Sequence, residues 1–213
     1  GVDKETPLEE TVRALDDLVR VGKVRYVGYS NFPAWQTMKA LAIADANKQA
    51  RFVSAQMYYS IAGRDIEREV VPLALDQNLA ILPWSPLAGG LLSGKFDANK
   101  QGPAGARRSG FDFPPVDHGR LPGVLDALRQ VSQETGLSVA RIALAWVLTR
   151  PFVTSVIIGA KNPDQLADNL AASDVTLTAA QIAHLDAASA LPSEYPGWMV
   201  DRQNHEPRTA NRS

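Results

Sequence analysis

The sequence predicts an α/β protein of the (β/α)8-barrel class, of which this chain supplies roughly the C-terminal half, strands 5 to 8 with their helices. β-rich segments alternate with helical patterns, and the strand starts at Val24, Phe52 and Ala80 are 28 residues apart each time. No glycine fingerprint of a doubly wound dinucleotide-binding sheet accompanies these repeats, which favours a barrel. A barrel needs eight strands and only four are predicted here, which would leave two exposed sheet edges.

The first predicted element is a helix. Thr6, Pro7 and Glu9 have the form of a capping box, with Thr6 as N-cap and Pro7 at the first helical position. Apolar residues then recur at helical spacing as far as Val19, and Gly22 ends the helix.

Four βα units follow this helix. Strands are predicted at 24–28, 52–58, 80–84 and 153–158, and helices at 33–47, 66–77, 124–135, 138–148 and 162–171. Ser138 is the expected cap of the helix at 138–148, Asn162 opens the one at 162–171, and a capping box at Thr178 begins a further helix. Pro72 indicates that the helix at 66–77 is kinked or begins late. Residues 88–119 are rich in Gly, Pro, Arg and Asp and form a long loop of the kind that is functional or disordered. We expect a barrel-derived domain at 1–190 and a polar tail at 191–213 lying over the surface.

Composition narrows the class of protein. The net charge is −1, with 22 basic and 23 acidic residues, and neither nucleic acids nor membrane surfaces are expected partners without a basic face. There is no cysteine, which is compatible with a cytoplasmic location and excludes thiolate metal sites. No apolar run is long enough to span a membrane, and the first ten residues do not resemble a signal peptide. The sequence has no initiator Met, and we expect it to begin partway through a fold.

Polar residues occur after the first predicted strand and near the end of the second. Ser30 and Asn31 offer a hydroxyl and an amide that could hold a planar amide group, although capping of the helix after Pro33 explains them equally simply. Gln56 is a polar residue within an apolar strand, where a bond to neighbouring backbone is the plain alternative.

The third and fourth strand ends suggest a ring and phosphate site. Trp84 could stack on a flat heterocycle or belong to the core. Ser85 and the glycines after it could approach a pyrophosphate, with Lys95 adding charge. Lys161 stands where a strand delivers a helix N-terminus, which is either an anion site or an ordinary capped helix.

In this order, the segments SN, Q, WSPLAGGLLSGK and IIGAKNPDQLADN resemble the aldo-keto reductase family, including its potassium-channel β-subunit branch. The resemblance covers Gly1 to about Ala188 and implies a TIM barrel that binds NADPH and reduces aldehydes or ketones. It assigns the nicotinamide carboxamide to the first two strand ends, the ring to Trp84, the pyrophosphate to the glycine-rich turn and the adenosine 2′-phosphate to the last helix. The implied cofactor-binding residues are Ser30, Asn31, Gln56, Trp84, Ser85, Pro86, Leu87, Gly89, Lys95, Ile158, Gly159, Lys161, Gln165, Asp168 and Asn169.

Two departures from the family pattern affect this expectation. Many relatives have Ser where Ala160 stands and Arg where Gln165 stands, so Lys161 becomes the main cation for a 2′-phosphate. Arg107 or Arg108 could close over the phosphates as in some relatives.

The family's catalytic set is an Asp, a Tyr, a Lys and a His from the first four strands, and none is assigned in this chain. We expect them upstream of Gly1, and we expect the 213 residues alone to be inactive. His118, His184 and His205 do not substitute for the missing His, and no metal site is expected. The alternatives are a non-enzymatic NADP-binding channel subunit or an inactive fragment, with a carbonyl compound, the missing half or a second copy as possible partners.

Overall fold

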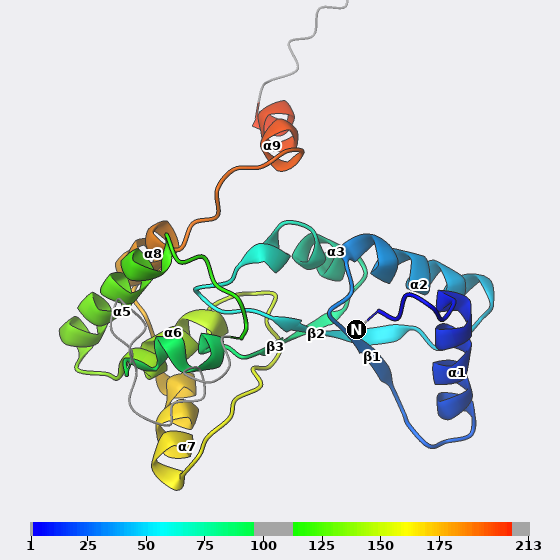
Figure 1. The fold of residues 1–213 in the computed structure, drawn as a ribbon, viewed down its shortest axis with the longest axis horizontal. Coiled ribbons are helices and arrows are strands. Elements are labelled where there is room, and N and C mark those ends of the chain that lie inside the picture. The colour runs from blue at the N-terminus through cyan, green and yellow to red at the C-terminus, as the bar shows by residue number, and fades with distance from the viewer. Residues whose placement is uncertain (1, 96–112, 206–213) are drawn as a thin grey trace, which may run out of the picture.

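The computed structural model describes residues 2–95 and 113–205. Its centre is a parallel sheet of β1 (Val27–Ser30), β2 (Phe52–Tyr58) and β3 (Ala80–Trp84) in the order β1-β2-β3 (Figure 1). Residues 52–58 and 80–84 are the strands that the sequence predicts, whereas β1 begins three residues later than expected. Because the strands are parallel, their carboxyl ends meet at one edge of the sheet.

The predicted fourth strand at 153–158 is not a strand in the structure. Its backbone nonetheless runs parallel to β3, with a bridge between Val153 and Ile81. The amide of Thr154 donates to the carbonyl of Ile81 at 3.0 Å, and that of Ile157 donates to Pro83 at 2.9 Å. Among the described residues, this segment has backbone hydrogen bonds to β3 and to no strand on its other side. It therefore follows the edge of the sheet without the regular hydrogen bonds of a fourth strand.

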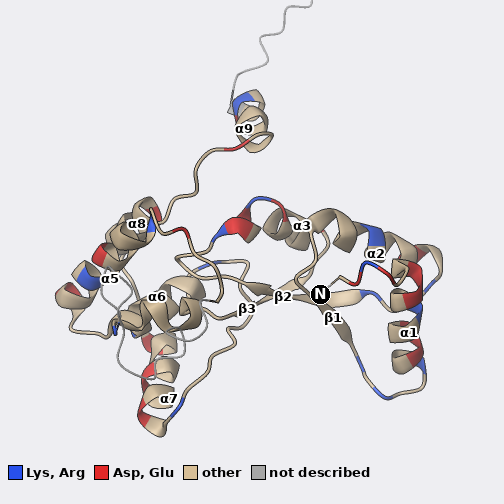
Figure 2. Cartoon of the chain, in the orientation of Figure 1, with Lys and Arg blue, Asp and Glu red and all other residues tan. Residues whose placement is uncertain are grey.

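Three helices, α1 (Leu8–Arg20), α2 (Ala34–Ala46) and α3 (Val70–Asp76), belong to the core that forms on one face of the sheet. Ala55, Met57 and Ile81 point into this core and are nearly inaccessible. Gln56 and the residues beside it on the opposite face are exposed or half-buried. Charged side chains lie on the helices and loops and are absent from the strands (Figure 2). The sheet is therefore covered on one face and open on the other.

A second apolar core joins α5 (Leu121–Thr135), α6 (Val139–Leu148) and α8 (Ala179–Ala188) around Trp146. Helix α7 (Pro163–Leu170) packs against α6. Tyr59, which follows β2, is fully buried against Trp146 with ring centroids 5.8 Å apart. Ile66 and Phe152 are half-buried and pack against both cores. Short 3-10 turns occur at Asp65–Glu67 (η1), Ala88–Ser93 (η2) and Ala171–Asp174 (η3).

Helix starts follow the sequence prediction in most cases. Ser138 and Asn162 accept a hydrogen bond from the third residue of their helices, and Thr178 forms the full capping box with Gln181. The predicted capping box at Thr6 is wrong: the helix begins at Leu8, Pro7 takes the N-cap position without a side-chain bond, and the Thr6 hydroxyl donates to Asp3.

The other helix boundaries differ modestly from prediction. α3 begins at Val70, so the late start inferred from Pro72 is confirmed. α5 begins at Leu121, three residues before the predicted start.

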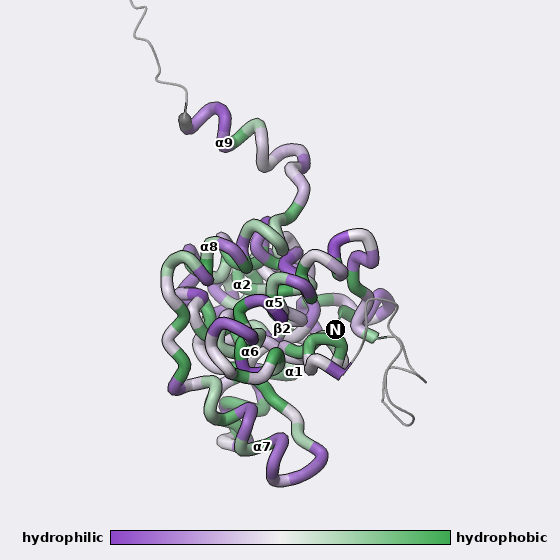
Figure 3. Tube along the Cα trace, turned by 90° about the vertical axis from the view of Figure 1, so that its left-hand side faces the viewer, coloured by the Kyte–Doolittle hydropathy of each residue, from purple (hydrophilic) through white to green (hydrophobic). Residues whose placement is uncertain are grey.

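The tail between residues 191 and 205 lies over the surface only in its first part. Its first part is held to the domain where Arg68 pairs with Glu194 at 2.5 Å and donates to the carbonyl of Pro192 at 3.4 Å. The chain then forms α9 (Gly197–His205), which stands away from the rest of the fold (Figures 1 and 3). The expectation of a tail lying over the surface is therefore wrong for this helix.

Candidate functional site

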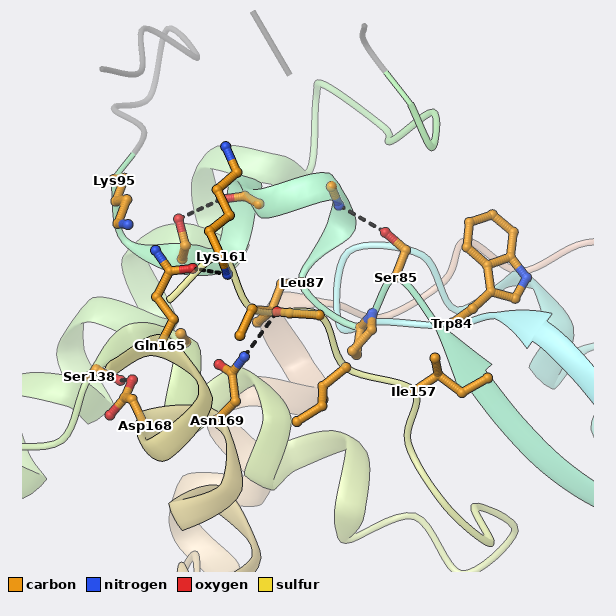
Figure 4. A pocket seen from close by; sticks show the side chains of 18 of the residues that line it. Trp84, Ser85, Leu87, Lys95, Ser138, Ile157, Lys161, Gln165, Asp168 and Asn169 are labelled. Atoms are coloured by element: carbon orange, nitrogen blue, oxygen red, sulfur yellow. Dashed lines mark hydrogen bonds between the residues drawn. The ribbon is translucent and has the colours of Figure 1, made fainter. Parts of the chain in front are cut away.

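A cavity of about 960 Å³ opens beside the carboxyl end of β3 (Figure 4). Its walls are the end of β3, the η2 turn, the 157–161 segment and the first turns of α6 and α7. Its volume lies at the upper end of the range for small-molecule and cofactor pockets. Figure 4 shows Trp84 and Ile157 at one end, and Lys95, Gln165 and Asp168 at the other.

The cavity collects most of the residues that the sequence singled out. Twelve of the fifteen line it: Trp84, Ser85, Pro86, Leu87, Gly89, Lys95, Ile158, Gly159, Lys161, Gln165, Asp168 and Asn169. The remaining three, Ser30, Asn31 and Gln56, are not in its wall but lie at the neighbouring strand ends. Arg107 and Arg108 lie outside the described residues.

An aromatic group forms one end of the cavity. The rings of Trp84 and Phe113 are stacked with centroids 5.7 Å apart and planes 12° apart, and Tyr58 lies beside Trp84 at 5.3 Å. Trp84 is the last residue of β3 and is half-buried. The contact with Phe113 shows that the indole face accepts a flat ring in parallel geometry.

The ends of β1 and β2 extend this aromatic end with polar groups. Ser30 pairs in register with Gln56 and donates its hydroxyl hydrogen to the Gln56 carbonyl at 2.7 Å. Asn31 has a φ of 60°, a left-handed conformation that asparagine tolerates better than most residues. The Asn31 side-chain oxygen accepts a 3.1 Å hydrogen bond from the indole of Trp84. Three consecutive strand ends thus contribute to one polar and aromatic surface.

The middle of the cavity is a turn with repeated positive φ angles. Ser85, Ala88, Gly89 and Gly90 have φ values of 52°, 48°, 65° and 101°. The Ser85 hydroxyl accepts a hydrogen bond from the Gly89 amide at 2.9 Å, which holds the turn closed. Gly89 and Gly90 adopt their angles without a steric cost and have no side chain, so the backbone can fold back sharply there and leave its surface accessible to a ligand.

Two lysines stand at the far end, where α7 begins. Lys95 and Lys161 are both exposed and line the cavity. The Lys161 amide donates to the side-chain oxygen of Gln165 at 3.0 Å, and Asn162 caps the helix by accepting from the Gln165 amide at 2.9 Å. Positive side chains beside a helix N-terminus favour an anion.

Asp168 also lines the cavity, but the protein itself occupies its carboxylate. Ser138 donates to it at 2.6 Å, and Arg141 donates through Nε at 3.0 Å and Nη2 at 2.6 Å. These bonds tie the N-cap of α6 to α7. Asp168 therefore holds the wall in place and has little capacity left for a ligand.

Asn169, which is 9% exposed, stabilises the 157–161 segment of the wall. Its side-chain amide donates to the carbonyl of Gly159 at 3.2 Å. A Cβ added at Gly159 would meet no atom within 4 Å, so this stretch of backbone borders open space.

Sequence reasoning missed several residues of the wall. Phe113, Ser138 and Ala140 contribute to it from segments with no ligand-binding signature, and Ile157 and Asp164 contribute from the IIGAKNPDQLADN segment, in which other residues were singled out. The capping role of Ser138 was recognised, but not its contact with Asp168, which is 30 residues away in sequence.

Of the histidines, His184 lies exposed on α8. Among residues 2–95 and 113–205, no three His, Asp or Glu side chains are grouped as metal ligands. In the same residues, no helix combines the length and apolarity needed to cross a bilayer.

Comparison with known proteins gives a family for this arrangement. The model of the "Aldo/keto reductase family" matches residues 1–190. This chain is a member of the aldo/keto reductase family. The family implies a (β/α)8-barrel fold, in agreement with the parallel βα units seen here.

Three relatives show the range of this family. The chain is 39% identical over 176 residues to "Uncharacterized oxidoreductase YrpG" of Bacillus subtilis, covering 83% of this chain and 52% of that protein. It is 32% identical to "Versiconal hemiacetal acetate reductase" of Aspergillus parasiticus, with coverage of 92% and 57%. It is 35% identical to "Probable voltage-gated potassium channel subunit beta" of Oryza sativa subsp. japonica, with coverage of 81% and 54%. The chain thus spans about half the length of these relatives.

Proposed function

We propose that the protein carrying this sequence reduces aldehydes or ketones to alcohols with NADPH, and that this chain supplies the cofactor site. The observation that carries the proposal is the cavity with a stacking aromatic ring at one end, a glycine-rich turn in the middle and two lysines at the other. A dinucleotide has the same order of groups: a flat ring, a pyrophosphate and a phosphorylated adenosine. NADPH, when bound, supplies the hydride.

The residues present fit this cofactor. Trp84 would stack on the nicotinamide ring, while Ser30, Asn31 and Gln56 would hold its carboxamide. The turn formed by Ser85, Pro86, Leu87 and Gly89 would lie along the pyrophosphate. At the other end the groups around the adenosine would be Lys95, Ile158, Gly159, Lys161, Gln165 and Asn169. Orientation of the ring is the main contribution of these residues to catalysis.

Preference for NADP over NAD depends in this proposal on two cations. Lys95 and Lys161 are both exposed at the adenosine end. Asp168 does not oppose them strongly, because Arg141 contacts its carboxylate at 2.6 Å. A 2′-phosphate placed there would meet a net positive surface.

We further propose that the chain is the C-terminal half of its barrel and that the catalytic Asp, Tyr, Lys and His lie elsewhere in the full-length protein. The sheet supports this, because its face with Gln56 is open. Apolar side chains are also exposed, among them Tyr26 just before β1, Val53 on β2, and Leu166 and Leu170 on α7. In this proposal the rest of the barrel covers the open face of the sheet.

The test is a calorimetric titration of the full-length protein with NADPH and NADH, followed by assays with a panel of aldehydes and ketones. We expect saturable binding, tighter for NADPH, and carbonyl-dependent oxidation of the cofactor. Absence of binding of either dinucleotide would reject the proposal. The 213-residue chain alone is expected to show no turnover.

A second candidate function is supported by the rice relative, whose name describes a channel subunit. In that case the protein binds NADPH as a regulatory subunit of a membrane protein. Stable co-purification with a channel, together with negligible carbonyl reduction, would favour it. The absence of cysteine is compatible with a cytoplasmic location for either function.

A further inference from the structure

We propose that Trp84 is a positioning residue that fixes the side-chain amide of Asn31 as a hydrogen-bond donor to the ligand, so that the site recognises the two ends of a primary carboxamide separately. The inference rests on the proposed function, because it assigns a specificity to the same dinucleotide site. It depends on two hydrogen bonds whose direction is set by the chemistry of the groups involved.

The first bond orients Asn31. Nε1 of Trp84 lies 3.1 Å from Oδ1 of Asn31. An indole nitrogen can only donate, whereas an asparagine amide can present either its oxygen or its nitrogen. The side-chain oxygen of Asn31 must therefore face Trp84. The NH2 group is left on the other side of the amide, and it has no hydrogen-bond partner among the described residues.

The backbone of Asn31 adds to this constraint. Its left-handed φ of 60° follows directly from the end of β1, and its amide N–H is 3.3 Å from the sulfur of Met57. Because the backbone is held in this way, only rotation about the side-chain bonds can turn the amide over. The Trp84 N–H opposes that rotation.

The second bond orients Ser30. Its Oγ lies 2.7 Å from the carbonyl oxygen of Gln56. A carbonyl oxygen can only accept, so the single hydroxyl hydrogen of Ser30 is used in this bond. Ser30 can then offer a ligand only its lone pairs, which makes it an acceptor.

Two consecutive residues thus present an acceptor and a donor at the same edge of the sheet. A primary carboxamide has the complementary pair, an NH2 group that donates and a carbonyl oxygen that accepts. Ser30 matches the NH2 group and Asn31 matches the carbonyl oxygen. Without the Trp84 N–H, Asn31 could turn its oxygen towards the ligand carbonyl, and this half of the recognition would weaken.

Four ligands separate these contacts in calorimetric titrations of the full-length protein. NADP⁺ has both carboxamide groups. Its thionicotinamide analogue replaces the carbonyl oxygen with sulfur, a weaker acceptor, and its 3-acetylpyridine analogue lacks the NH2 group. The fourth ligand, 2′-phospho-ADP-ribose, lacks the whole ring and reports on the rest of the site.

The variant Trp84→Phe keeps a flat ring and removes the N–H. We expect it to bind NADP⁺ about fivefold more weakly, the value of one neutral hydrogen bond. The preference for NADP⁺ over the thionicotinamide analogue should shrink by a similar factor, because the lost contact is the one to the carbonyl. The preference over the 3-acetylpyridine analogue and the affinity for 2′-phospho-ADP-ribose should stay within about twofold of wild type.

Asn31→Asp is the second variant. It keeps an oxygen for Trp84 but replaces the donor with a charged acceptor, so NADP⁺ affinity should fall about 30-fold while 2′-phospho-ADP-ribose binding is retained. Thermal melts check that both variants are folded.

The possible outcomes separate the two proposals. If wild type binds both NADP⁺ and 2′-phospho-ADP-ribose but Trp84→Phe leaves the thionicotinamide preference unchanged, the positioning role is wrong and the cofactor site stands. Equal weakening of all four ligands also overturns it, since that indicates general damage to the site. If wild type binds neither, the proposed function fails and this inference fails with it.

Discussion

Replacement of Asp168 by Ala tests whether this carboxylate holds the cavity wall. The change removes three hydrogen bonds, from the Ser138 hydroxyl at 2.6 Å and from Nε and Nη2 of Arg141 at 3.0 and 2.6 Å. Hydrogen bonds to a charged group contribute about 1.5–3 kcal/mol each when buried. The Arg141 and Asp168 side chains are 27% and 31% exposed, so water screens the pair and replaces part of what is lost.

We therefore expect the free energy of unfolding to fall by about 2 kcal/mol, far less than the sum of three buried bonds. NADPH affinity should fall as well, because α7 loses its attachment to α6. Chemical denaturation of the full-length protein and calorimetric titration measure the two effects.

Two control variants make the result specific. Asp168→Asn keeps an acceptor for Ser138 and should lose about half as much stability. Asp126→Ala removes a surface pair with Arg129, in which Asp126 is 73% exposed, and should change stability by less than about 0.5 kcal/mol. If Asp168→Ala were no more destabilising than Asp126→Ala, the structural role assigned to Asp168 would be refuted.

Three further predictions follow from other parts of the structure. Burial, together with the hydrogen bond to Glu67, raises the pKa of Tyr59, so the folded state keeps its proton above the unfolded pKa near 10. Its contribution to stability is complete below that pH and is lost above it, by about 1.4 kcal/mol per pH unit, until the folded pKa is reached. Denaturation at alkaline pH should show this loss, and Tyr59→Phe should make it shallower without abolishing it, because burial also raises the pKa of Tyr29. Gly28→Ala would place a Cβ 2.3 Å from Oγ and 2.9 Å from the carbonyl oxygen of Ser54, and a cost of about 1–3 kcal/mol is expected in a thermal melt; a neutral result would mean that the strands separate easily. Lys161→Gln should weaken NADPH binding about tenfold and leave NADH binding within about twofold, and equal loss of both would place the 2′-phosphate elsewhere.

Local signals in the sequence predicted much of the fold. The capping residues Ser138, Asn162 and Thr178 begin helices as expected, because each needs only a partner three residues along the same chain. Thr6 has the same local pattern, but the helix begins at Leu8 with Pro7 in the N-cap position, so Thr6 lies one residue too early to cap it. A capping pattern thus predicts a cap only where the helix begins at the next residue.

The elements that sequence reasoning misjudged depend on distant partners. Residues 153–158 have a strand-like composition, but pairing with β3 on one side gives only a bridge. The composition of α9 did not predict a helix that stands away from the rest of the fold. Strand formation and helix docking depend on what the rest of the molecule places beside a segment.

The candidate site also has a part that the sequence predicted and a part that it did not. Strand-end positions pointed to Trp84, Ser85, Lys95 and Lys161, because parallel strands bring their carboxyl ends together, and the family resemblance added the other wall residues. Contacts across the fold were not predictable: Trp84 and Asn31 are 53 residues apart, and Arg141 and Asp168 are 27 apart. These contacts decide which polar atoms remain available to a ligand.

The two ends of the candidate site are anchored in different apolar cores. Asn31 is flanked by Tyr29 and Phe32 of the sheet core, whereas the η2 turn is anchored through Leu91 and Leu92 in the helical core. A dinucleotide lying along the cavity would therefore contact residues anchored in both cores at once and would link the two cores. Amide hydrogen exchange should then slow on both sides of the junction when the ligand binds, including in segments that never touch it.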